Sequence, residues 1–374
     1  MVEQLKQTII RRHITLLLPL ILAGCIEPIE PELGVFDYLM VVEGHVSNLD
    51  EVNTVRLSRT KPLGVEYGGV EVGALVYVED QEGAKFYFEE SSPGIYQSDP
   101  ACFIGETGNS YALHIETLYG ETYQSKPILL NATPDIDSLY FEREQRLTNE
   151  GITKDGIKIL LDSHDPEGLT QYFRYEWEET YQIKVPYPED ISVWVCYNTE
   201  TNSDILTTNT SQLKESRVSQ LEIKYVSTDG YQLRSLYRLL VRQYALSSSG
   251  IKYWTELKKI SESQGTLFDP LPYDLPSNLF NPNNPDEQVI GFFDVGAVTQ
   301  KEIYIDRSQL LDLDFASDGC SSKLVEVSGG GSPPAGYCLA SQGPYGSGIN
   351  YYAPEYCCDC RLYGELEVPD FWPN

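Results

Sequence analysis

Positive charge is scarce in this chain. Its 374 residues include 27 lysines and arginines against 56 aspartates and glutamates, which gives a formal net charge of −29 at pH 7. A chain this acidic is repelled by the phosphate backbone of nucleic acids, and no basic stripe offsets the repulsion. The sequence therefore predicts that nucleic acid is not a partner.

Long hydrophobic runs are also lacking near the N-terminus. The apolar run at residues 14–22 is interrupted by Thr15 and Pro19. It is too short to cross ~30 Å of hydrocarbon, which needs about 20 residues in a helix. A basic segment containing Lys6, Arg11 and Arg12 precedes it, so the run has the size and the flank of a signal-peptide core.

The small residues Ala23 and Gly24 stand directly before Cys25, as in a lipoprotein cleavage site. We predict that residues 1–24 are a cleaved signal peptide and that Cys25 is acylated. A lipid of two or more chains would anchor the protein firmly, at ~0.8 kcal/mol per buried methylene. Residues 25–35 then form an acidic tether whose prolines prevent a helix. The alternative is an ordinary secretory signal that happens to contain a cysteine.

Seven of the eight cysteines remain after Cys25, and export permits disulfides. An odd number leaves at least one thiol unpaired, and we expect it to be Cys102, which lies on an expected strand. The predicted disulfide-forming residues are Cys196, Cys320, Cys338, Cys357 and Cys360.

The cysteine spacing leaves several pairings open. A bond between Cys320 and Cys338 would add ~3 kcal/mol in the chain-entropy model. Cys196 is a plausible partner for Cys357 or Cys360 and would tie the C-terminal tail to the preceding domain. Cys357 and Cys360 also have the C-x₂-C spacing of zinc ligands. Because an exported chain favours disulfides over thiolates, we predict no metal and no cofactor.

Short alternating stretches dominate the middle of the chain. Residues 54–58 alternate polar and apolar side chains, as a half-buried strand does, and similar stretches recur to about residue 310. We expect a mainly β protein, with an N-terminal Ig-like β-sandwich at 36–131 and a second β-rich domain at 132–310. One amphipathic helix is expected at 248–263, and we interpret its apolar stripe as core packing. The stripe consists of Ile251, Trp254, Leu257 and Ile260.

Residues 311–374 are rich in cysteine, tyrosine and glycine. This tail buries too little to order itself, so we expect disulfides to hold it against the second domain, with Phe371 and Trp372 docking its end. Tyrosine offers a large contact area at a low entropic cost, which suits interfaces. The tyrosines outside expected strands are therefore candidates for a partner-facing surface: Tyr337, Tyr345, Tyr351, Tyr352 and Tyr356.

Groups suited to catalysis are few. The histidines that follow the signal peptide are His45, His114 and His164. No serine or cysteine occurs in a nucleophile-elbow motif or in a Cys/His catalytic motif. A carboxylate-based glycosidase needs two carboxyl groups ~5–9.5 Å apart, which sequence does not reveal. Asp162, His164 and Asp165 could hold calcium, but a turn explains them equally well. We therefore expect no catalytic residues, with a secreted hydrolase of glycans or peptides as one alternative and an adhesin or structural surface protein as another.

Several motifs follow one another along the chain. They are Pro134-Asp135-Ile136-Asp137-Ser138-Leu139, Gln264-Gly265-Thr266-Leu267-Phe268-Asp269-Pro270, Val289-Ile290-Gly291-Phe292-Phe293, Cys357-Cys358-Asp359-Cys360 and Pro369-Asp370-Phe371-Trp372. In this order they resemble an outer-membrane lipoprotein family of Bacteroidota catalogued as domain of unknown function 4249. The first domain is also similar to the transthyretin-like sandwich of carboxypeptidase regulatory domains. Cys102 and Cys358 fall outside the family's pattern.

The resemblance implies a location and a partner but no activity. Such proteins are often encoded beside TonB-dependent outer-membrane transporters, and the acidic tether is similar to the export signal of their surface lipoproteins. We therefore expect a lipid-anchored protein exposed on the outer membrane, which acts by binding as an accessory subunit of a TonB-dependent barrel in nutrient capture. The family supplies no catalytic residue and no ligand.

Overall fold

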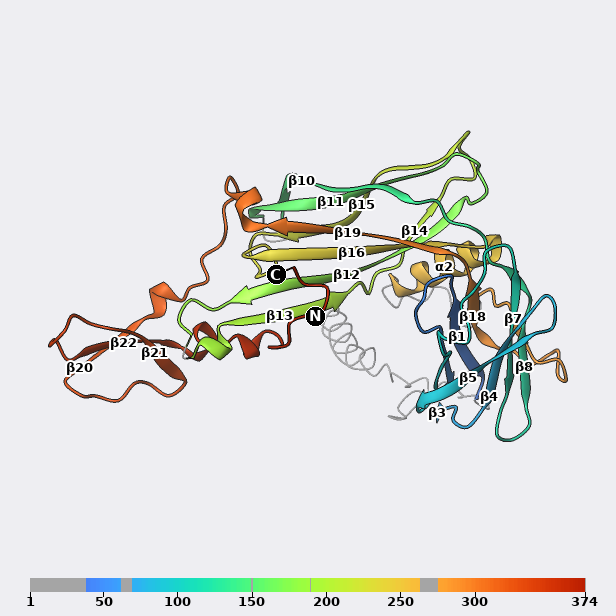
Figure 1. The fold of residues 1–374 in the computed structure, drawn as a ribbon, viewed down its shortest axis with the longest axis horizontal. Helices are drawn as coiled ribbons and strands as arrows, with labels where there is room; N and C mark the ends of the chain where they lie inside the picture. The colour runs from blue at the N-terminus through green and yellow to red at the C-terminus, as the bar shows by residue number, and fades with distance from the viewer. Residues whose placement is uncertain (1–37, 62–68, 149–150, 189, 263–274, 374) are drawn as a thin grey trace, which may run out of the picture.

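The computed structural model describes residues 38–61, 69–148, 151–188, 190–262 and 275–373. Strands dominate this part of the chain, and α2 (Ser248–Ser261) is its one α-helix, so the expected mainly β fold is confirmed. The predicted signal peptide and the lipidation site Cys25 lie outside the described residues. Three parts follow each other along the long axis: an N-terminal sandwich, a second sandwich and a small C-terminal sheet (Figure 1).

The N-terminal sandwich is built from one continuous path of hydrogen-bonded strands. Its strands are β1 (Met40–Val46), β2 (Thr54–Arg59), β3 (Gly69–Val70), β4 (Leu75–Asp80), β5 (Lys85–Ser92), β6 (Ile95–Gln97), β7 (Ser110–Glu116), β8 (Thr122–Ser125), β9 (Ile128–Leu129), β17 (Leu279–Phe280) and β18 (Ile290–Val295). The path runs β17-β8-β7-β4-β5-β6-β2-β1-β18, with β3 beside β2 and β9 beside β7. β5 forms the corner, because its first half pairs with β4 and its second half with β6. Both layers bury their inward side chains in one core.

β18 joins the N-terminal sheet although it lies far along the chain. It pairs in parallel with β1, from Val41 opposite Ile290 to Val46 opposite Val295. From sequence we expected a strand at Phe292 and Phe293 in the second region. A buried apolar strand carries no local signal that says which sheet it enters.

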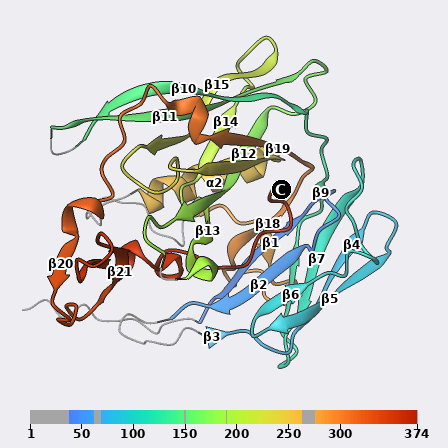
Figure 2. The same ribbon diagram turned by 60° about the vertical axis from the view of Figure 1, so that its left-hand side comes forward.

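The second sandwich packs two sheets face to face. Its strands are β10 (Ile136–Leu147), β11 (Thr153–Asp165), β12 (Tyr172–Lys184), β13 (Val195–Thr201), β14 (Leu206–Asn209), β15 (Ser216–Ser227), β16 (Leu236–Ala245) and β19 (Val298–Asp306). One sheet has the order β10-β11-β15 and the other the order β13-β12-β16-β19, with β14 also beside β12. Ile157 and Ile159 of the first sheet share a core with Tyr237 and Leu239 of the second. Figure 2 shows the two sheets from a second direction.

Helix α2 begins after Ser247, whose hydroxyl accepts a hydrogen bond from the backbone N–H of Gly250. Serine is a favoured N-cap because its side-chain oxygen satisfies a free backbone N–H of the first turn. The helix packs its Tyr253 into the core of the N-terminal sandwich. Residue 263, the expected last residue of the helix, lies outside the described part of the chain.

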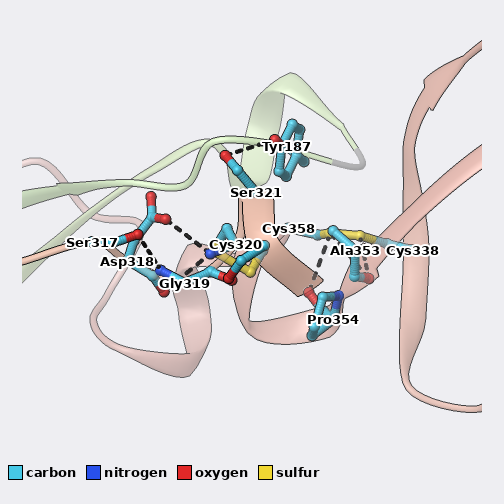
Figure 3. Close-up of a disulfide and its surroundings, with 12 residues drawn as sticks. Tyr187, Ser317, Asp318, Gly319, Cys320, Ser321, Cys338, Ala353, Pro354 and Cys358 are labelled. Atoms are coloured by element: carbon cyan, nitrogen blue, oxygen red, sulfur yellow. Dashed lines mark hydrogen bonds between the residues drawn. A yellow bond between two sulfur atoms is a disulfide. The ribbon is translucent and has the colours of Figure 1, made fainter. Parts of the chain in front are cut away.

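The C-terminal tail forms strands that the sequence did not predict. They are β20 (Val325–Ser328), β21 (Tyr337–Gln342) and β22 (Ile349–Pro354), in the order β20-β22-β21. Three disulfides hold this region: Cys196–Cys360, Cys320–Cys357 and Cys338–Cys358. Figure 3 shows the Cys338–Cys358 bond and its surroundings. All five candidate cysteines are thus paired.

The Cys320–Cys338 pairing is not formed. Cys320 precedes β20 and Cys338 lies on β21, which are opposite edges of the small sheet. Both instead bond to the turn after β22, the central strand, and this explains why Cys357 and Cys358 are adjacent in sequence. Cys102 is free and exposed, but it lies in a turn after β6 rather than on a strand.

The tail is attached to the second sandwich at several points. Beyond Cys196–Cys360, the backbone of Tyr197 exchanges hydrogen bonds with Glu365, and Tyr187 N–H donates to the carbonyl of Cys357. Trp372 packs edge-on against Tyr197 and is buried, as expected. Phe371 stays 41% exposed, with the Arg238 guanidinium 3.8 Å from its ring centroid.

Replacing Cys196 and Cys360 together by alanine should lower the free energy of unfolding by about 2–5 kcal/mol, because this disulfide closes the longest loop. The loop spans 164 residues. Urea denaturation without reductant measures the change. Cys102→Ala is the matched control and should leave the midpoint where it is. Equal midpoints for the double variant and the wild type would contradict the assigned pairing.

A candidate ligand-binding cleft

A cavity of about 740 Å³ lies where the N-terminal sandwich, the second sandwich and α2 meet. This volume is within the ~300–1,000 Å³ range of ligand sites. Strands alternate their side chains between two faces, so β12 sends Phe173 and Tyr175 into the core and Arg174 and Glu176 to the outer face. The cavity lies against that outer face. Its polar and aromatic lining includes Glu43, His45, Arg174, Glu176, Arg242, Tyr244, Tyr253, Trp254 and Asp294.

Arg174 is the central charge of the cleft. Its side chain is buried, and its guanidinium lies 4.3 Å from the ring centroids of both Tyr244 and Trp254. It forms an ion pair with Glu176, two residues along the same strand. The Tyr244 hydroxyl donates to Glu176 Oε2 at 2.6 Å. The cation is therefore held by two rings and a carboxylate, which fixes its position.

Helix α2 is tied to the cleft by a hydrogen bond. Trp254 Nε1 donates to Asp294 Oδ2 of β18 at 2.9 Å. We interpreted the apolar stripe of this helix as core packing, and Ile251 is indeed buried, while Trp254 and Leu257 pack against the core of the N-terminal sandwich. Trp254 and Leu257 also line the cavity.

Buried nitrogen atoms without a hydrogen-bond partner among the described residues gather beside this cavity. They are both ring nitrogens of His45, Nε of Arg174 and Nε of Arg242. The His45 ring contacts the Tyr244 ring edge-on, with centroids 5.0 Å apart. Burying an unsatisfied polar group costs ~1–3 kcal/mol, so such groups are rare and tend to mark functional places.

The titration of the cleft follows from burial and charge. Burial lowers the pKa of His45 to about 4, with Asp294 opposing the shift and Arg174 adding to it. Burial raises the pKa of Glu176, but the Arg174 guanidinium and the Tyr244 hydroxyl outweigh it and leave that pKa below its ordinary value. At neutral pH the imidazole is therefore uncharged and the carboxylate is ionised.

A second cavity of about 500 Å³ continues along the same sheet face. The two cavities share Glu51 and Arg242, whose side chains form an ion pair at 3.4 Å. Beyond them, Arg238 is paired with Glu178 at 3.2 Å and with Glu302 at 2.7 Å. Together the cavities form a groove over β12, β16 and β19 that ends at Phe371. We call this the sheet groove.

The tail tyrosines lie away from the cleft, in the C-terminal sheet at the other end of the molecule (Figure 1). Contrary to the prediction, Tyr337 lies on β21 and Tyr351 and Tyr352 on β22. Neighbours on a strand point to opposite faces, so Tyr351 and Tyr352 do not share one surface. Tyr345 is fully exposed, and Tyr356 is half-buried beside Cys357.

The two aspartates that could have held calcium lie on β11 and have hydrogen-bond partners within the protein. The Asp165 carboxylate accepts backbone hydrogen bonds from Glu167, Gly168 and Thr170. Asp162 accepts from the Ser138 hydroxyl and from a backbone N–H. Within the described residues, no three His, Cys, Asp or Glu side chains are arranged to hold a metal ion.

Comparison with known families assigns the chain. The family described as Domain of unknown function (DUF4249) matches residues 26–302. The chain belongs to this family. The matched segment contains the whole lining of the 740 Å³ cavity but ends before the C-terminal sheet, so the Cys357–Cys360 and Pro369–Trp372 motifs lie outside the match. No curated protein matches the chain. In the described residues, no helix has the length and apolar character to cross a membrane.

The sequence analysis missed the cleft. Arg174, Glu176, Arg238 and Arg242 look like the solvated face of ordinary strands, and no local signal distinguishes them. The one available clue was the charge on β12, where five of 13 residues are charged, together with two arginines on the otherwise apolar β16. Sequence alone does not show that α2 and β1 cover this face.

Replacing His45 by phenylalanine should make the free energy of unfolding depend less on pH between pH 7 and pH 4. The folded-state pKa of His45 is about 4 and the ordinary value is 6.5, so the unfolded state takes up the proton first. The free energy of unfolding of the wild type therefore falls as the pH drops from 6.5 to 4, and His45 accounts for about 2–3 kcal/mol of this fall. The stability difference between His45→Phe and wild type should grow by that amount between pH 7 and pH 4, as measured by chemical denaturation.

Two further results make this experiment decisive. At pH 7, His45→Phe should equal or exceed wild type by ~1 kcal/mol, because two unsatisfied nitrogens are removed. His45→Gln should show the same flattened pH dependence without that gain, since glutamine does not titrate but keeps polar atoms. Parallel pH curves for all three proteins would contradict the buried, neutral imidazole.

Proposed function

We propose that this protein is a lipid-anchored surface protein of the outer membrane that acts by binding, as an accessory subunit of a TonB-dependent transporter in nutrient capture. The observation that carries the proposal is the cleft, in which Arg174, Glu176 and Trp254 from two elements surround a volume suited to a small ligand. Mixed aromatic and polar walls with fixed side chains are typical of binding sites.

The N-terminal sequence supports the location. A basic segment, a short apolar run and the small residues before Cys25 occur in the order of a lipoprotein signal. A tether of about ten residues would hold the folded part close to the membrane. This raises the effective concentration beside a neighbouring barrel into the mM range, so a strong intrinsic affinity for the barrel is not required.

Binding without catalysis fits the carboxylates of the cleft. A general acid needs a raised pKa, whereas the pKa of Glu176 is lowered by Arg174 and Tyr244 despite burial. Asp294 accepts hydrogen bonds from Trp254 and from its own strand. These groups are arranged to hold a structure and a ligand in place.

Cys25→Ala tests the anchor and the partner together. The variant should leave the membrane fraction, while Cys102→Ala, the matched control, should stay there. Mass spectrometry of the wild-type N-terminus should show an acylated Cys25. In mild detergent, the tagged wild type should co-purify with a stoichiometric outer-membrane barrel.

Two outcomes would overturn parts of this proposal. If the mature N-terminus carries no lipid, whichever residue it begins with, the protein has no anchor and the proposed location is wrong. An acylated protein that co-purifies with no barrel would favour an adhesin or structural surface protein. Release of a cleaved product from a bound ligand would favour the hydrolase.

A further inference from the structure

We infer that the sheet groove, which includes the cleft, binds a neutral oligosaccharide. The inference rests on the proposed binding function and names its ligand class. It is carried by the charge balance of the lining, by the shape of the two joined cavities and by the pairing of the strands beneath them.

Each arginine that lines the two cavities lies beside a carboxylate. Arg174 is paired with Glu176, and Arg242 with Glu51. Arg238 is held between Glu178 and Glu302, and Arg56 lies opposite Glu43 in the β1–β2 register. The remaining cation, Lys301, donates to the backbone carbonyls of Ile136 and Asp137. Six carboxylates thus line the two cavities against five cations, so the lining has no surplus of positive charge, in a chain whose net charge is −29. An anionic ligand would meet repulsion without compensation.

The same pairs suit a ligand rich in hydroxyl groups. A hydroxyl both donates and accepts hydrogen bonds, so it can donate to Glu176 or Glu51 and accept from a neighbouring guanidinium. It does so without separating the ion pair. A purely apolar ligand would leave these groups desolvated and unpaired, which is costly.

The shape of the site favours a chain of several sugar units. The cavities of about 740 and 500 Å³ meet at Glu51 and Arg242 and follow the outer face of one sheet. Trp254 and Leu257 line one end, and Phe371 lines the other. These side chains give apolar surface to the C–H faces of sugar rings, while the middle of the groove is polar.

The strand pairing disfavours an extended peptide as the occupant. Peptides that bind to sheets add a strand at a free edge and use main-chain hydrogen bonds. β12 already pairs with β16 on one side and with β13 and β14 on the other. β16 pairs with β12 and β19. Over β12 and β16 the groove therefore offers side chains of a sheet face and no free main-chain edge; β19, the terminal strand of this sheet, pairs with β16 alone and has its free edge on the side away from β16.

The test is a binding screen with the full mature protein. An array of neutral glycans, acidic glycans and peptides is followed by calorimetry with maltotetraose, cellotetraose, mannotetraose, tetragalacturonate and tetra-alanine, together with the strongest neutral hit of the array. We expect binding to at least one neutral glycan, recovered uncleaved, with an affinity that changes less than about twofold between 50 and 500 mM NaCl because the contacts are uncharged on the ligand side.

Arg242→Gln places the binding in the groove. Losing a charged hydrogen-bond donor should weaken binding by about tenfold or more. Arg217→Gln is the matched control, because Arg217 is an exposed arginine of β15 that also has a carboxylate partner, Glu215, and lies outside both cavities. Equal thermal melting of the two variants would show that Arg242→Gln still folds.

The outcomes separate this inference from the proposed function. Binding only of acidic glycans or of peptides, or of no glycan on the array, overturns the ligand class even if a barrel co-purifies. Neutral-glycan binding that Arg242→Gln leaves unchanged overturns the site. Neutral-glycan binding without a barrel partner removes the transporter role and leaves this inference standing.

Discussion

The relative position of the two sandwiches depends on one short crossover. β18 pairs in parallel with β1, and only two residues, Gly296 and Ala297, separate β18 from β19 of the second sandwich. A Cβ on Gly296, one of these two residues, would lie 1.9 Å from the carbonyl oxygen of Ala245, so no other residue fits. Gly296 N–H donates to Val46 and Ala297 N–H to Asn131. With so little chain between two hydrogen-bonded strands, the sandwiches have little freedom to move apart, and the cleft between them is built into the backbone.

The polar wall of the cleft follows from that geometry. The crossover brings β1 and α2 over the outer face of β12 and β16, which would otherwise be open to water. Arg174 can be buried there because Tyr244, Trp254 and Glu176 replace its hydration. His45 receives no such replacement from the part of the chain that the structure describes, where neither ring nitrogen has a hydrogen-bond partner. The site thus retains local instability that the apolar cores of both sandwiches offset.

Local features of this fold could be predicted from sequence, and pairing over long distances could not. The alternation at residues 54–58 and the cap at Ser247 depend on neighbouring residues, and both appear in the structure. The β1–β18 pairing joins residues about 250 positions apart, and Phe292 and Phe293 would suit any buried strand. The cleft depends on that pairing, so its residues read as ordinary strand charges. The partners of Cys320 and Cys338 could not be predicted for a similar reason, because these two cysteines lie at opposite edges of a sheet that the polar, glycine-rich sequence did not predict.

The C-terminal sheet links the fold to a compartment. Its small core consists mainly of cysteines: Cys320, Cys338, Cys357 and Cys358 are buried there with Ala353. So few apolar atoms cannot offset the entropy of ordering three strands, and the covalent bonds must supply the difference. Disulfides persist outside the reducing cytosol, which is where a chain with a lipoprotein-like N-terminus would be delivered. The predicted signal peptide and the disulfide-dependent sheet are unrelated features of the chain, and both therefore favour the same environment.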